Sequence, residues 1–391
     1  MRFSSFFIGL LLFFLTINLA KGETFVVSSN ADAGANTLRD ALTRAAANGN
    51  AETDRIVFNL ATAQLADRTI TLLSALPEIT SNLIIDGSSQ PSTQLGISGA
   101  KVIIDADKNS KFSIFIINKQ DISVEIYGLK LYKAPLALAF QFEIAYGISI
   151  NTKSKVTIGA PGKGNVICGF WAGIFGNLGD GKIQSNFIGV LEDGNTAAAN
   201  LKGIIGRQRY DYLENALIGG EQKNEGNVIS GCETGISFDT PSTSGTDETI
   251  TIINNSIGTN FSETAIIPPP SFGFYHIYTR QRVVLILKKN VFAPNLTGLQ
   301  LHNGTKATLL GNFFGTNRNQ DPVFNKMNAN AISGNSFVEL IVGGENTGDD
   351  NIFTNYQFPI SVINASKALV TKNNFYCNTS PLLNLGSNFN D

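Results

Sequence analysis

The side chains best suited to chemistry lie in two stretches of this sequence. DTPSTSGTDET, at 239–249, supplies acidic groups, and YHIYTRQR, at 275–282, places aromatic rings beside cations. Rings next to a few charged and hydrogen-bonding groups are typical of sites for polar ligands such as sugars. The candidate substrate-binding residues are Asp239, Asp247, Glu248, Tyr275, His276, Tyr278, Arg280 and Arg282. The alternative is that the first stretch is a turn insertion and the second an exposed strand.

No catalytic set is recognisable around these candidates. A glycosidase needs a pair of positioned carboxylates. A lyase that acts on uronate polymers needs cations or calcium to neutralise the substrate, together with a Lys or Arg base. Neither set stands out in the sequence, so the catalytic residues stay unassigned.

The sequence predicts no cofactor. His276 and His302 are the two histidines, and neither has a thiol or carboxylate at the spacing of zinc ligands. Asp349 and Asp350, in GENTGDD, could offer oxygen atoms to calcium but lack the alternating spacing of a calcium loop. We expect these two carboxylates to be solvated in a turn.

A repeated phrase organises the second half of the chain. NVISGCETGI begins at Asn227 and has counterparts at Asn165, Asn290 and Asn351, at spacings of 62, 63 and 61 residues. Other phrases fall between them, the second at Asn186, Asn255, Asn312 and Asn374 and the third at Gly203, Gly273 and Asn330. Three phrases per unit predict three sub-repeats of roughly 21 residues each.

The sub-repeats predict an all-β solenoid. Each carries short β-branched or aromatic runs between Gly and Asn residues, which indicates short strands and tight turns. Stacked coils of such strands form a right-handed parallel β-helix, here with three coils per 62-residue unit. The recurring asparagines are expected to bond along the stack. A leucine-rich repeat or a propeller would need a different motif or unit length.

The three cysteines are Cys168, Cys232 and Cys377, and an odd count gives no disulfide framework. Cys168 and Cys232 occupy equivalent places in successive units, so three coils, or roughly 14 Å, are expected between them. The Cα atoms of a disulfide lie within about 7 Å of each other. We therefore expect no bond between these two residues.

The first residues predict a secretory signal peptide over 1–22. Arg2 precedes an apolar run over 6–17, and small residues follow at Ala20 and Gly22, so cleavage after either fits the pattern. No later run is long enough to span a bilayer. The net charge is −2, or −4 without Arg2 and Lys21, which argues against a nucleic-acid partner. We expect a secreted or cell-surface protein.

The stretch ANTLRDALTRAAANGN, residues 35–50, predicts a single amphipathic helix. Thr37 and Asp40 form a capping pattern, and Gly49 can end the helix. A lone helix ahead of a solenoid is expected to cap its first coil and block edge pairing. Runs that predict the strands of the first coils lie at 54–60, 69–80, 82–87, 101–105 and 112–118.

These N-terminal runs resemble a known family. TLRDALTRAA, DRIVFNL, TITLLSALPEIT and LIIDGSSQP are similar, in this order, to the N-terminal segment of exported bacterial right-handed β-helix repeat proteins. The later IGG, GNVISG and NNxIGT phrases resemble the body of the same family, so the similarity covers most of 25–375. It implies a pectin-lyase-like solenoid on a secreted or surface-attached protein. It implies no single activity, because members range from polysaccharide-degrading enzymes to adhesins.

We therefore divide the chain into a signal peptide (1–22), an N-terminal cap with irregular coils (23–110) and β-helix repeats (111–391). The leading hypothesis is a non-catalytic surface scaffold, adhesin-like or carbohydrate-binding, with a polysaccharide or cell-surface glycan as partner. One alternative is a polysaccharide lyase or glycoside hydrolase. Another is a structural spacer within a larger surface protein.

Overall fold

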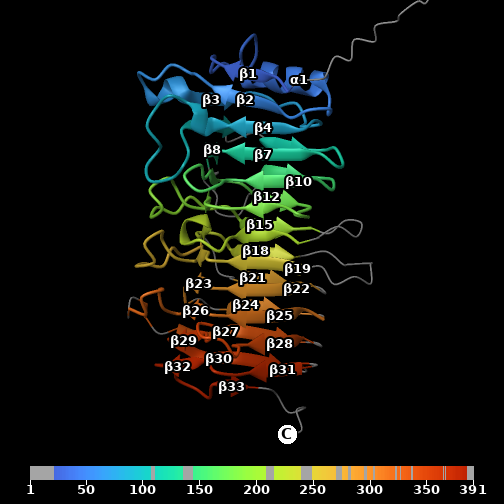
Figure 1. Ribbon diagram of the computed structural model, residues 1–391. Helices are drawn as coiled ribbons and strands as arrows, with labels where there is room; N and C mark the ends of the chain where they lie inside the picture. Colours follow the sequence, from blue (N-terminus) through green and yellow to red (C-terminus); the bar gives the residue numbers. More distant parts are fainter. Residues whose placement is uncertain are drawn as a thin grey trace, which may run out of the picture.

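The chain winds into a stack of coils bounded by three parallel sheets (Figure 1). This computed structural model describes residues 22–106, 111–134, 144–207, 215–238, 249–269, 275–280, 283–294, 297–302, 304–321, 324–325, 327–335, 338–363, 365 and 367–384. Successive coils add one strand to each sheet in a fixed order, and every pairing between strands is parallel. The predicted parallel β-helix is confirmed.

We name the sheets A, B and C in the order in which the chain visits them. Sheet A contains β1 (Thr24–Val27), β2 (Asp54–Phe58), β4 (Leu83–Asp86), β7 (Ser123–Tyr127), β10 (Lys155–Ile158), β13 (Lys182–Ile183), β16 (Leu217–Gly219), β19 (Thr249–Ile253), β22 (Val284–Lys288), β25 (Lys306–Leu310), β28 (Glu339–Val342) and β31 (Lys367–Val370). Sheet B contains β3 (Thr69–Leu72), β5 (Val102–Ala106), β8 (Leu129–Lys133), β11 (Val166–Cys168), β14 (Phe187–Ile188), β17 (Val228–Ile229), β20 (Ser256–Ile257), β23 (Val291–Phe292), β26 (Phe313–Phe314), β29 (Ile352–Thr354) and β32 (Asn374–Tyr376). Sheet C contains β6 (Phe115–Ile117), β9 (Tyr146–Ile150), β12 (Ala172–Gly176), β15 (Lys202–Gly206), β18 (Thr234–Phe238), β21 (Tyr275–Thr279), β24 (Thr297–Leu301), β27 (Met327–Asn335), β30 (Tyr356–Ile363) and β33 (Leu383–Asn384). Short 3-10 turns lie at Leu65–Arg68, Gly87–Ser89 and Lys223–Glu225.

The predicted helix is present as α1 (Leu38–Asn48), at the N-terminal end of the stack (Figure 1). Thr37 caps it, because its hydroxyl accepts a hydrogen bond from the backbone N–H of Asp40 at 3.2 Å. The apolar side of the helix packs into the same core as the coils and includes Leu38 and Leu42. The helix therefore covers the edge that the first coil would otherwise expose.

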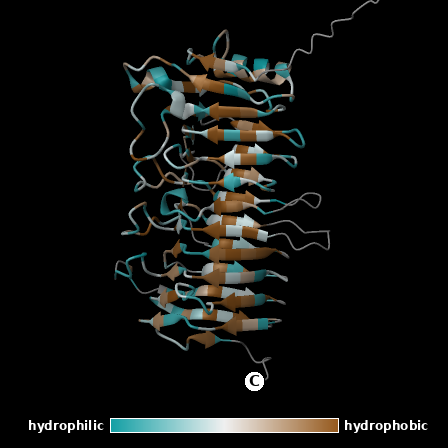
Figure 2. Ribbon diagram, in the orientation of Figure 1, coloured by the Kyte–Doolittle hydropathy of each residue, from teal (hydrophilic) through white to brown (hydrophobic). Residues whose placement is uncertain are grey.

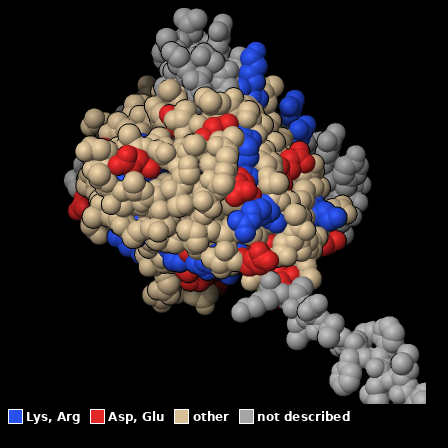
Figure 3. Space-filling model, turned by 90° about the horizontal axis from the view of Figure 1, so that it is seen from above, with Lys and Arg blue, Asp and Glu red and all other residues tan. Residues whose placement is uncertain are grey.

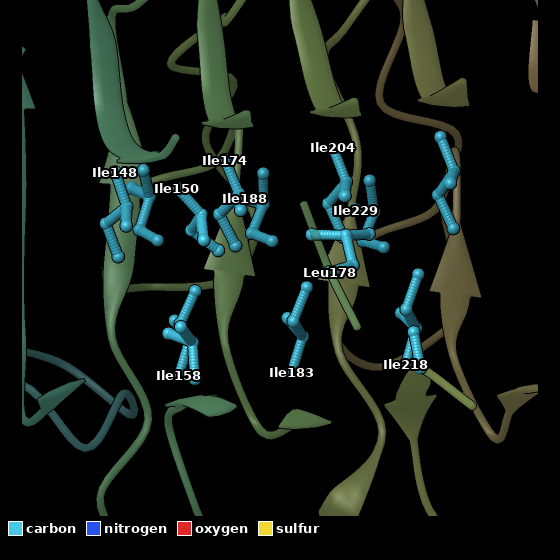
Figure 4. Close-up of a cluster of buried hydrophobic side chains, with 14 of the residues drawn as sticks. Ile148, Ile150, Ile158, Ile174, Leu178, Ile183, Ile188, Ile204, Ile218 and Ile229 are labelled. Carbon is cyan, nitrogen blue, oxygen red and sulfur yellow. The ribbon is translucent and has the colours of Figure 1, made fainter. Parts of the chain in front are cut away.

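A continuous apolar core runs through the coils, as the brown bands of Figure 2 and the side chains of Figure 4 show. Each strand contributes the side chains that point inward. Residues of the same kind at equivalent positions in successive coils therefore stack on one another. In sheet C, for example, Ile148 pairs with Ile174 and Ile174 with Ile204. Burial of about 1.5–3 kcal/mol per large aliphatic side chain makes this column the main source of stability.

A ladder of buried asparagines marks the turn between sheets A and B. The side-chain Nδ2 of Asn165 donates to Oδ1 of Asn186 at 2.9 Å, and Asn186 donates in turn to Asn227 at 3.0 Å. The ladder continues through Asn255, Asn290, Asn312, Asn351 and Asn373. Each Nδ2 also donates to a carbonyl at the end of a sheet A strand, as Asn186 does to Ile158. The predicted stacking of asparagines is confirmed.

The ladder corrects the expected number of coils. Its members stand on successive coils, so a 62-residue unit contains two coils rather than three. The third phrase, at Gly203 and Asn330, belongs to sheet C of a coil already counted, and Gly273 lies outside the described residues. At the last coil the ladder uses Asn373 instead of the expected Asn374, whose amide bonds to Asp350 at 2.7 Å.

The unit spans two coils because long and short connections between sheets B and C alternate. The connection after β14 runs from Gly189 to Leu201, whereas the one after β17 needs only 230–233. A folded loop of this length is thicker than the 4.7–4.9 Å between neighbouring strands. Long loops therefore fit only on every second coil, and they lie along one side of the stack (left in Figure 1).

The corrected number of coils per unit also changes the expected distance between two of the cysteines. Cys168 and Cys232 lie two coils apart, not three, with β14 between β11 and β17. All three cysteines are free thiols. Burial raises the pKa of Cys168 and that of Cys232 to about 12, so both are neutral, unreactive groups at neutral pH.

The surface carries charges of both signs. Figure 3, which looks onto the N-terminal end, shows Lys and Arg interspersed with Asp and Glu among many uncharged residues. No helix in the described part of the chain is long and apolar enough to cross a membrane.

Candidate functional site

The long loops enclose a groove along the outer face of sheet B. Its floor is a column of paired residues, Phe187, Val228 and Ser256, from three successive coils. One wall consists of the turns between sheets A and B, including 223–227, and the other of the long loops. The cavity has a volume of about 490 Å³ and extends from Gln94 to Asn319 in sequence. We call it the sheet B groove.

The loop wall is built from four loops that bond to one another. The N–H of Ile97 donates to the carbonyl of Glu192 at 2.9 Å, and the N–H of Phe261 donates to Gly194 at 2.9 Å. Farther along, the N–H of Arg318 donates to the carboxylate of Glu263 at 3.3 Å. The first contact joins loops three coils apart and the other two join loops two coils apart, which makes the wall continuous.

An ion pair lies in this wall, between Glu263 and Arg318. Their closest atoms, Oε1 and Nη1, are 2.5 Å apart, and the side chains are 9% and 15% exposed. The Ser256 hydroxyl donates to the same carboxylate oxygen at 2.8 Å. Burial lowers the pKa of Arg318, and the adjacent Glu263 opposes this shift. The two charges compensate each other, so the groove is close to neutral.

Glu263 occupies a left-handed backbone conformation, with φ of 60°. The equivalent positions of the neighbouring loops have the same conformation in Gly194, at 67°, and Gln320, at 62°. This conformation is unfavourable for a residue with a side chain. At Glu263 this conformation coincides with a carboxylate that has Ser256 and Arg318 as partners.

Phe261 gives the groove an exposed aromatic surface. Its side chain is 53% exposed, and its ring lies 5.6 Å from that of Phe187 in the floor. Most other lining groups are amides, hydroxyls and glycine backbone, such as Asn254, Ser262 and Gly226. Among the described lining residues the charged ones are Lys223, Glu263 and Arg318. The arrangement suits an uncharged, hydroxyl-rich ligand.

The residues singled out from the sequence do not lie in this groove. Tyr275, His276 and Tyr278 belong to β21 in sheet C, and Arg280 follows that strand. Asp239, Asp247, Glu248 and Arg282 lie outside the described residues.

Two of the predicted aromatics do come together on sheet C. The rings of Tyr275 and Tyr278 are 5.0 Å apart, and Tyr278 meets His302 edge to face at 5.7 Å. Tyr275 and Tyr278 are half-buried.

His276 is buried rather than available to a ligand. Its Nε2 lies 2.7 Å from the carbonyl oxygen of Ala293, and the ring packs beside Phe292. Burial lowers its pKa from 6.5 to about 4, so the ring is neutral at pH 7 and donates to that carbonyl. The side chain of His276 is therefore not open to a ligand in this structure.

The equivalent position in other coils shows why His276 is unusual. It stands one residue before a core aliphatic, where the other strands of sheet C from β9 to β30 have Gly147, Gly173, Gly203, Gly235, Gly298, Ala331 and Pro359. At Gly235 a Cβ would lie 2.7 Å from a backbone oxygen. His276 instead fills space against Gly258, where a Cβ would come within 2.4 Å of its ring. Gly258 begins the loop that carries Glu263.

Sequence reasoning missed the residues that line the groove, including Phe261, Glu263 and Arg318. A signal was present, because TNFSE (259–263) and TNRNQ (316–320) both follow the Gly of the second repeated phrase. In both, the chain inserts a loop at the same point of the coil. Comparing these two insertions would have pointed to the loop wall.

The described residues hold no group of three or more His, Cys, Asp or Glu side chains that could bind a metal ion. No protein-family model matches the chain, and no curated protein matches it. The function must be inferred from the geometry of the groove.

Proposed function

We propose that this protein is an exported scaffold that binds a segment of a polysaccharide in the sheet B groove without cleaving it. The observation that carries the proposal is the exposed ring of Phe261 in a near-neutral groove lined by amides and hydroxyls. A sugar ring presents an apolar face and a rim of hydroxyl groups. It can place the face on Phe261 and the rim against the polar walls.

The length of the groove favours a polymer over a small molecule. Its floor crosses β14, β17 and β20, three coils at 4.7–4.9 Å per step. This distance accommodates more than one sugar unit along the solenoid axis. The walls are fixed by hydrogen bonds between loops, so little ordering is needed on binding.

The lining argues for binding rather than cleavage. Hydrolysis of a glycosidic bond uses two carboxyl groups on opposite sides of the bond. Among the described lining residues, Glu263 is the one carboxylate, and Arg318 and Ser256 already engage it. The same pairing occupies Arg318, so Lys223 is the other cation among the described lining residues, whereas a lyase needs cations to neutralise its substrate as well as a base.

Export and a relation to pectin-lyase-like solenoids belong to the same proposal. The leader-like pattern over 1–22 and the order of the N-terminal motifs support them. A surface location would bring the groove to an extracellular glycan.

The proposal is tested by titrating the protein with neutral and acidic oligosaccharides in a calorimeter. We expect the Phe261→Ala variant to weaken binding at least roughly tenfold, the equivalent of about 1.4 kcal/mol. Leu73→Ala is the matched control, because Leu73 is a large apolar residue, 78% exposed, that does not line the groove. This control should leave the affinity unchanged.

The same samples are assayed for new reducing ends and for unsaturated uronates, with and without calcium. Binding without turnover is the expected result. Turnover would contradict the non-catalytic role, and equal affinities for Phe261→Ala and the native protein would contradict the groove as the binding site.

A further inference from the structure

A buried carboxylate with one unpaired oxygen lies at the N-terminal end of the fold. Asp54, the first residue of β2, has no exposed surface. Its Oδ1 accepts hydrogen bonds from Nδ2 of Asn48 at 2.7 Å and from the backbone N–H of Glu23 at 2.8 Å. Its Oδ2 has no hydrogen-bond partner among the described residues. A buried carboxylate oxygen in this state is costly.

The surroundings of Asp54 favour a positive charge. Asn48 is the last residue of α1, and the carbonyl groups at the C-terminal end of a helix carry a partial negative charge. The carboxylate adds a full negative charge at the same place. The two bonded donors, from Asn48 and Glu23, are both neutral amides. A cation at the nitrogen of Glu23 would compensate both sources of negative potential.

Gly22, the residue before Glu23, packs closely against the backbone of Thr53 in the uncut chain. A Cβ at Gly22 would lie only 2.2 Å from the carbonyl oxygen of Thr53, so a larger residue would displace the backbone. In sequence, Ala20, Lys21 and Gly22 give the small-x-small pattern that precedes the cut of a signal peptide.

We propose that maturation cleaves the bond between Gly22 and Glu23, and that the new α-ammonium group of Glu23 pairs with Asp54. Water adds across the peptide bond, the carboxylate leaves with Gly22, and the amine of Glu23 takes up a proton. An amide N–H supplies one donor, whereas the ammonium group supplies three. The added donors reach Oδ2 as well as Oδ1, because the nitrogen already lies 2.8 Å from the carboxylate.

The competing cut, after Ala20, lacks this gain. It would leave the Glu23 nitrogen as a neutral amide and Oδ2 of Asp54 without a partner. Of the two cleavage points that the sequence leaves open, the cut after Gly22 is thus the one whose product gains a charged partner for Asp54. The inference rests on the proposed export of the protein but is independent of what the groove binds.

The first test produces the full chain in an exporting host and determines the N-terminal sequence and mass of the product. A product that begins at Glu23 is the expected result. A product that begins at Lys21 would overturn the assigned cleavage point while leaving export intact. A chain that keeps its first 22 residues would contradict export itself.

The second test measures how fast the α-amine of the exported product is acylated near pH 7. In the ion pair the amine is held in its protonated form, so we expect slow reaction in the folded protein and faster reaction after unfolding. Asp54→Asn should restore fast reaction in the folded state. Glu52→Gln, a change of the same charge at an exposed residue two positions away, should not.

The pH dependence of the same reaction tests the native product alone and does not require the Asp54 variant to fold. The ion pair predicts an α-amine that titrates above the ordinary pKa of about 7.7–8.0. An ordinary pKa, or equal rates in the folded and unfolded protein, would overturn the pairing.

Discussion

The buried imidazole of His276 ties the stability of the fold to pH. Burial places its pKa at about 4 in the folded protein, below the value of about 6.5 expected in the unfolded chain. The unfolded chain therefore takes up a proton first as the pH falls. Stability from this residue is complete above pH 6.5 and is lost progressively towards pH 4, at up to about 1.4 kcal/mol per pH unit.

Replacing His276 by Gln tests this dependence. Gln has no titratable group but can still donate a hydrogen bond to the carbonyl of Ala293. We expect the slope of unfolding free energy against pH between 6.5 and 4 to become shallower than in the native protein. The measurement is urea denaturation across that range.

His302→Gln provides the comparison. His302 is only partly buried, and burial lowers its pKa as well, so its removal should change the slope less. A slope that falls equally in both variants would contradict the assignment to His276.

At the scale of the element, the asparagine ladder holds the coils in register. Asn227 is a central member: it accepts a side-chain hydrogen bond from Asn186 and donates one to Asn255 and another to the carbonyl of Ile183. It is 1% exposed, so water cannot replace these partners. Removing this side chain takes away the acceptor of the backbone N–H of Asn186 and a donor to the carbonyl of Ile183.

Asn227→Ala should therefore destabilise the protein by about 3 kcal/mol, since each unsatisfied buried group costs about 1–3 kcal/mol. Thermal and urea unfolding measure the loss. Asn59→Ala is the control, because Asn59 is an exposed asparagine. Its removal should change the free energy of unfolding by less than about 0.5 kcal/mol. Similar losses in the two variants would show that the ladder adds little.

The repeats in the sequence predicted the ladder and the strands but gave the wrong number of coils. Spacing reports how many residues separate two equivalent asparagines, and it does not say how many are stacked in coils and how many lie in loops. The step from Asn165 to Asn186 and the longer one from Asn186 to Asn227 are each one coil. Part of the difference is the long connection over 189–201.

At the scale of the molecule, the same loops explain why the groove does not contain the described candidate residues that were predicted from the sequence. The candidates that were predicted from charge and aromatic side chains include residues of β21, which lies in sheet C. The groove depends instead on four loops that are far apart in sequence and adjacent only once the coils stack. Composition showed which residues could bind sugar, but the face they occupy depends on the register of the strands.

The helical cap and the buried positions of the strands, by contrast, could be predicted from local sequence patterns. Thr37 and the apolar spacing of 38–45 fixed the place of α1, because capping and amphipathic periodicity act within one helix. The alternating burial of β7 and β22 follows the period of two in their sequences. The order of long and short loops has no comparable local signal.

The most direct test of the account is hydroxyl-radical footprinting of the whole protein with and without a bound oligosaccharide. We predict protection of the groove, at Phe261 in the loop wall, at 223–228 in the facing turns and at 316–321. Tyr275 and Tyr278, on the outer face of sheet C, should react equally in both samples. Protection of these two tyrosines with none at Phe261 would contradict the groove as the binding site.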